Sequence, residues 1–64
     1  MNNSKQVVDD AIKSINTCVK ISIIDIEKSI SAAEYLIMEG EYGRIDEYRL
    51  KKDFLISKLN KIKE

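Results

Sequence analysis

The chain has 64 residues, so it forms at most one small domain, and a domain of this size buries only about 60% of its unfolded surface. With one cysteine and no histidine, it has no intrachain disulfide and no basis for a cysteine–histidine metal site. Its 11 basic and 11 acidic residues balance, so the whole chain has no net electrostatic attraction for nucleic acid.

Composition also indicates a folded, non-membrane protein. Hydrophobic residues make up 44% of the chain, which is too much for a disordered segment. The first residues lack the apolar core of a signal peptide, and no uncharged run is long enough to cross a membrane. We therefore expect a soluble cytoplasmic protein. Frequent Ile, Lys and Asn with no Pro are typical of an AT-rich genome, such as that of a low-GC bacterium or its phage.

Residues 1–4 form a flexible polar lead that ends at Ser4, a suitable helix N-cap. The segment 5–38 contains neither Gly nor Pro, and its apolar residues recur at helical spacing. This spacing predicts one long amphipathic helix over 5–38 with a heptad-like stripe. The stripe consists of Val8, Ile12, Ile15, Val19, Ile23, Ile26, Ile30, Ala33 and Ile37.

Two alternatives compete with a continuous helix. The run over 19–26 is rich in β-branched residues and partly alternates, which is also typical of a strand. A break near residues 16–17, with Thr17 capping a new helix, would instead give a chain of three helices.

The loop predicted over 39–43 contains Gly40 and Gly43, which suit a helix C-terminus and a sharp reversal. A second helix is predicted over 44–63, so we expect residues 1–64 to form a single all-α helical hairpin. Residues 1–43 carry a net charge of −3 and residues 44–64 a net charge of +3, which favours antiparallel docking of the two helices.

The two predicted helices differ in length, and this mismatch predicts self-association. At 1.5 Å per residue they would span about 51 and 30 Å, which would leave the apolar stripe before residue 19 uncovered. The simplest cover is a second copy, giving a dimeric four-helix bundle or coiled coil. The expected self-association residues are Val8, Ile12, Ile15, Val19, Ile23, Ile26 and Ile30.

No pattern in the sequence predicts catalysis, a cofactor or a metal. Without a histidine to act as a base, Cys18 is expected to be a small buried apolar residue. We therefore expect a non-enzymatic interaction module: a regulator, adaptor or inhibitor of a host factor, possibly encoded by a phage or plasmid. The residues expected to bind a protein partner are Tyr42, Glu41 and Arg44, at the predicted loop.

Two other functions remain open. A nucleic-acid-binding dimer would use the basic face of the second helix, with Arg44, Lys51, Lys52 and Lys58 as its candidates. A purely structural subunit of a larger assembly would need no other partner.

Overall fold

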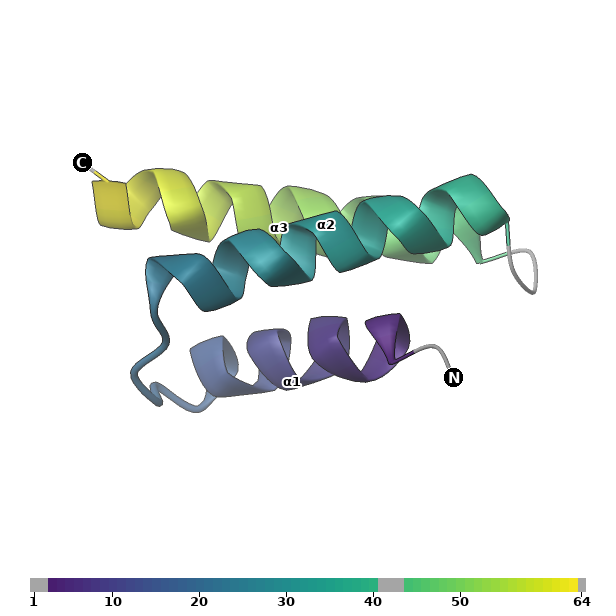
Figure 1. Cartoon of the computed structure of the whole chain (residues 1–64). Helices are drawn as coiled ribbons and strands as arrows, with labels where there is room; N and C mark the ends of the chain where they lie inside the picture. The colour runs from purple at the N-terminus through teal and green to yellow at the C-terminus, as the bar shows by residue number, and fades with distance from the viewer. Residues whose placement is uncertain (1–2, 41–43, 64) are drawn as a thin grey trace.

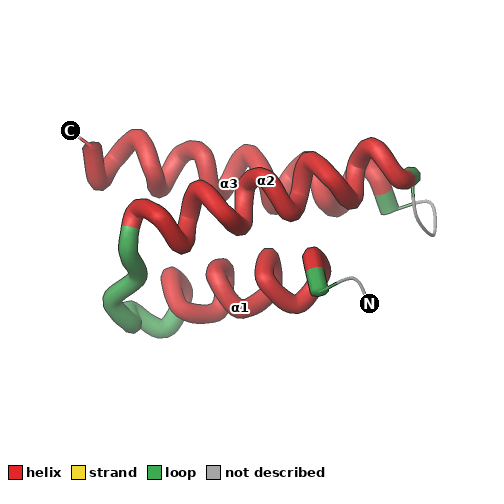
Figure 2. Tube along the Cα trace, viewed as in Figure 1, coloured by secondary structure: helices red, strands yellow, loops and turns green. Residues whose placement is uncertain are grey.

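The computed structural model describes residues 3–40 and 44–63, which form three α-helices. These are α1 (Ser4–Asn16), α2 (Ile23–Glu39) and α3 (Ile45–Lys63). Helix α2 runs antiparallel to both of the others, and α1 and α3 run in the same direction (Figure 1). Within the described residues the chain is helical apart from short connecting segments, so the predicted all-α class is confirmed (Figure 2).

The prediction of one continuous helix over 5–38 is wrong. The first helix ends at Asn16, and a non-helical segment over 17–22 leads to the start of α2 at Ile23 (Figure 2). The strand alternative over 19–26 is also wrong, because residues 23–26 are helical and residues 19–22 pair with no strand. The alternative that matches is a three-helix chain with a break near residues 16–17.

Local chemistry explains the break. The Thr17 hydroxyl donates to the carbonyl oxygen of Lys13 at 2.8 Å, and Cys18 takes a left-handed backbone conformation with φ 60°. A left-handed residue cannot continue a right-handed helix. The new helix is capped by Ser22 rather than by Thr17, because the Ser22 Oγ accepts a hydrogen bond from the Asp25 backbone nitrogen at 3.1 Å.

Gly40 ends α2 as the sequence predicts. Its φ of 62° lies in the left-handed region, and its backbone N–H donates to the carbonyl oxygens of Leu36 and Ile37. Glu39, the first residue of the predicted loop, belongs to α2, and residues 41–43, including Gly43, lie outside the described residues.

The core is made by one face of each helix. Tyr48, Leu55 and Leu59 of α3 pack with Ile26, Ala33 and Leu36 of α2, and with Val8 and Ala11 of α1. Ser29 is the one polar residue in this buried set, and its hydroxyl donates to the Ile26 carbonyl oxygen at 2.6 Å. Helix α1 packs mainly against α2 and touches α3 much less. The chain itself therefore covers the apolar face of its first helix, and the length mismatch no longer requires a second copy.

Replacing Ser22 by alanine should lower the free energy of unfolding by about 1 kcal/mol, because the Asp25 backbone N–H loses its acceptor. Urea denaturation followed by circular dichroism measures this change. The control is Ser31→Ala in the exposed middle of α2, which should be neutral or slightly stabilising because alanine is the better helix former. Equal stability of Ser22→Ala and the wild type would contradict the capping role.

Two substitutions at position 18 test the break, because the observed turn and a continuous helix predict opposite orders of stability for them. In the observed left-handed conformation, Cys18→Gly should be more stable than Cys18→Ala by about 1 kcal/mol. A continuous helix predicts the reverse order by a similar amount, because glycine is the poorer helix former. The same denaturation measurement on the two variants decides between the two structures.

Candidate interaction surfaces

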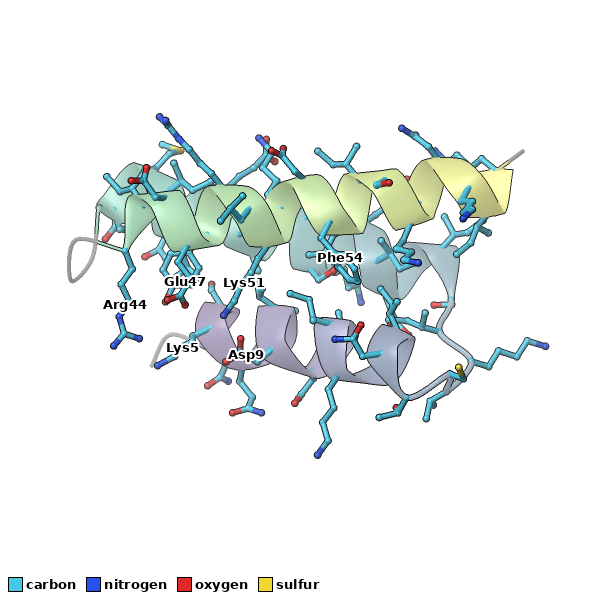
Figure 3. The ribbon with its side chains drawn as sticks, turned by 180° about the vertical axis from the view of Figure 1, so that it is seen from behind. Lys5, Asp9, Arg44, Glu47, Lys51 and Phe54 are labelled. Carbon is cyan, nitrogen blue, oxygen red and sulfur yellow. The ribbon has the colours of Figure 1, made fainter. Side chains whose placement is uncertain are left out.

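Lys51 connects α3 to α1. Its Nζ lies 3.0 Å from Oδ1 of Asp9 on α1 and 3.1 Å from Oε2 of Glu47, one turn earlier on α3 (Figure 3). The same ammonium lies 5.7 Å from the centre of the Tyr48 ring. The helices α1 and α3 are in limited contact, and this three-residue cluster joins them through the Lys51–Asp9 ion pair.

Burial by itself lowers the pKa of Lys51, because it penalises the charged ammonium. The hydrogen bonds to Asp9 and Glu47, together with their negative charges, outweigh that effect and leave the pKa above its ordinary value of 10.5. The protonated lysine therefore favours the folded chain.

Two further ion pairs connect α3 to α2. Lys52 lies 3.2 Å from Glu34, and Lys63 lies 3.7 Å from Glu27. Both pairs join the basic second part of the chain to its acidic first part, in the antiparallel order that the charge distribution predicts. They are well exposed, and such pairs contribute little to stability.

These contacts divide the four nucleic-acid candidates. Lys51 and Lys52 already pair with carboxylates, and Lys58 lies over the Phe54 ring with its Nζ 5.6 Å from the ring centre. Arg44 is exposed at the start of α3. The structure therefore does not gather the four into one unpaired basic surface.

The predicted partner-binding residues are only partly described. Arg44 projects from the end of the bundle where α3 begins (Figure 3). Glu41 and Tyr42 lie outside the described residues, so the structure says nothing about them.

The predicted self-association residues do not form one surface. Val8 and Ile26 are completely buried inside the chain, and Ile12, Ile15 and Ile30 pack against that core. Only the remaining two are exposed: Val19, in the segment between α1 and α2, and Ile23, at the start of α2. The stripe read from the sequence is mostly an intrachain core.

Helix α2 carries an exposed apolar row that the sequence analysis did not single out. Ile24, Tyr35 and Met38, called the outer row below, have exposed fractions of 63%, 45% and 85%. Their positions differ by 11 and 3 residues, so they lie along one helix face, opposite to the buried one. The sequence feature that could have identified this row is that its three residues are apolar but fall outside the periodic stripe.

A shallow groove of about 290 Å³ lies at the end of the bundle where α1 and α3 finish; it is called the end groove below. The end of α1 and the segment after it meet the last turns of α3 there. The lining residues are Ile15, Cys18, Val19, Ile21, Lys58, Lys61 and Ile62. Cys18 is exposed, so the expectation that it is buried is wrong.

The described residues contain no group of three or more metal-binding side chains drawn from His, Cys, Asp and Glu. Over the same ranges, 3–40 and 44–63, no helix has the length and hydrophobicity needed to span a membrane. Comparisons with protein-family models, curated proteins and solved structures found no match, so no property of a relative bears on these surfaces.

Replacing Lys51 by methionine should destabilise the protein by about 1 kcal/mol at neutral pH, because Asp9 and Glu47 lose their shared cation. The folded-state pKa of Lys51 lies above the unfolded value near 10.5, so the stabilising effect is complete below that pH and disappears as pH rises through the folded value. Urea denaturation of both proteins at pH 7 and pH 11 measures it.

The matched control is Lys13→Met, an exposed α1 lysine with no described ion pair. Its effect at pH 7 should be much smaller. A difference between Lys51→Met and the wild type that stayed constant up to pH 11 would contradict the assignment.

Proposed function

We propose that this chain is a non-enzymatic protein-interaction module, acting as a regulator, adaptor or inhibitor, and that the outer row of α2 docks into an apolar groove on its partner. The observation that carries the proposal is the exposure of Ile24, Tyr35 and Met38 on one face of a helix whose opposite face is fully packed. Amphipathic helices commonly bind partner grooves through anchors at i, i+3, i+4 and i+7. Tyr35 and Met38 have this spacing, and Ile24 lies three turns before Tyr35 on the same face.

The chemistry of the row supports this role. Methionine and tyrosine are enriched in protein interfaces, the first because it is flexible and polarizable and the second because it combines apolar area with a hydroxyl. The row extends over about 21 Å, the length of four helical turns. Lys28 and Ser31 lie between Ile24 and Tyr35 on the same face; the small side chain of Ser31 lets a partner approach the helix closely there.

A nucleic-acid-binding role has less support. It depends on unpaired cations that could replace the counterions of phosphates. Lys51 and Lys52 are already engaged by carboxylates of the chain itself, and binding phosphate would mean breaking those pairs. The exposed apolar row, in contrast, has no role in such a complex.

Met38→Lys should weaken partner binding at least about tenfold, because burial of a large aliphatic side chain contributes about 1.5–3 kcal/mol. The test is affinity capture from the source cells with tagged wild-type and variant proteins, followed by quantitative mass spectrometry. The control is Leu50→Lys, the same kind of change at an exposed leucine of α3. Circular dichroism should show that both variants are folded.

The expected result is a protein captured by the wild type and by Leu50→Lys and captured much less by Met38→Lys. Apolar docking should also persist at about 0.5 M salt, whereas binding to nucleic acid would fall steeply. Equal capture by all three proteins, or recovery of nucleic acid in a salt-sensitive manner, would contradict the proposal.

A further inference from the structure

The end groove has a basic rim. Of the five lysines of α3, Lys51, Lys52 and Lys63 form ion pairs, and the other two are Lys58 and Lys61. No described carboxylate lies within 4 Å of either of these two, and both line the groove. The rest of the lining is apolar apart from Cys18, and Val19 is 57% exposed. The groove therefore suits an apolar side chain that has carboxylates beside it.

The same chain presents such a side chain on the first half of α3. Leu50 is 72% exposed, and Asp46 and Asp53 lie about one turn before and after it. Neither aspartate forms an ion pair within the described residues. The nearby Asp9–Lys51–Glu47 cluster adds one net negative charge. Arg49 is also exposed beside Leu50, so the negative charge of this half lies at Asp46, Asp53 and the cluster and not on every side of the leucine. The other half is basic around an apolar groove.

We propose that two copies of this chain pair through α3 in antiparallel orientation, so that Leu50 of each copy enters the end groove of the other. The arrangement has a two-fold axis and is closed, because each copy supplies one leucine and one groove. This surface is separate from the outer row of α2, and it differs from the α1 stripe from which the sequence predicts a dimer.

One register satisfies the charges and the apolar contact together. In a register centred between residues 53 and 54, Asp46 faces Lys61 of the second copy and Lys58 faces the second copy's Asp9–Lys51–Glu47 cluster. Leu50 then lies opposite Ser57, next to Lys58 and Lys61 at the rim of the end groove. Phe54 is partly exposed on the flank of α3 beside α1, so the two rings would lie close to the axis (Figure 3).

The dimensions predict a weak dimer. Helix α3 is about 28 Å long, and one face of it falls short of the ~800 Å² per partner of a standard interface. We therefore expect a dissociation constant of about 10–500 μM. A small amphiphilic anion is a poorer occupant, because the groove is open to solvent and small ligands usually bury about 70–90% of their surface.

Sedimentation equilibrium at protein concentrations between about 10 μM and 1 mM tests the proposal, because this range spans the expected dissociation constant. The wild type should associate with rising concentration, and Leu50→Lys should weaken association at least about tenfold by placing a charge in the groove. Met38→Lys is the matched control, with the same substitution at an exposed apolar residue of α2, and it should associate as the wild type does. Circular dichroism verifies folding of each variant.

A charge exchange tests the register. Asp46→Lys and Lys61→Glu alone should each weaken association about fivefold, because each puts two like charges opposite one another. The double variant restores opposite charges and should return to within about twofold of the wild type. A wild type that stays monomeric up to 1 mM, association insensitive to Leu50→Lys, or a double variant weaker than either single one would each overturn the proposal. None of these outcomes affects the α2 proposal, which Met38→Lys tests.

Discussion

Val8 and Ala11 bury the apolar face of α1 against the α2–α3 pair, and the rest of the structure depends on that contact. It requires the chain to reverse between α1 and α2, so the non-helical segment over 17–22 is as important as the core residues. Cys18 in a left-handed conformation and Ser22 as a helix cap make the reversal possible. A 64-residue chain has little apolar area to lose, so covering α1 internally removes the strongest physical reason for an obligate dimer.

Internal cover also decides which surfaces remain available. With most of the periodic stripe buried, the large exposed apolar residues of α2 and α3 include the outer row on α2 and Leu50 on α3, together with Ile23 and Ile62 at the helix ends. The charges divide in the same way. Lysines that face α1 or α2 are neutralised by Asp9, Glu47, Glu34 and Glu27, whereas Lys58 and Lys61 are left beside the end groove. The interaction surfaces are thus defined by what the three helices leave unpaired.

The sequence analysis identified the buried residues better than it identified their partners. Val8, Ile26 and Ala33 lie on the predicted stripe and are fully buried, yet they meet residues of the same chain. Periodicity indicates which face of a helix is buried. It does not indicate whether the residues that cover this face belong to the same chain or to another one. For the same reason the sequence analysis did not identify the outer row. Residues outside a stripe are assumed to be solvated unless the structure shows a large exposed patch.

The sequence by itself determined the helical class, the glycine that ends α2, and the attraction between an acidic first part and a basic second part. These properties depend either on neighbouring residues or on the charge distribution along the chain, so they do not depend on how the helices pack. The prediction of Ser4 as a helix cap is wrong, because Ser4 lies inside α1 and the N-cap residue is Asn3. Tertiary structure alone decided that the first helical segment is interrupted. The β-branched run at 19–24 has weak helix propensity, and burying Val8 and Ala11 against the other two helices favours reversal over continuation. Helical spacing continues in phase across that segment, so periodicity did not decide between a continuous helix and the predicted alternative with a break near residues 16–17.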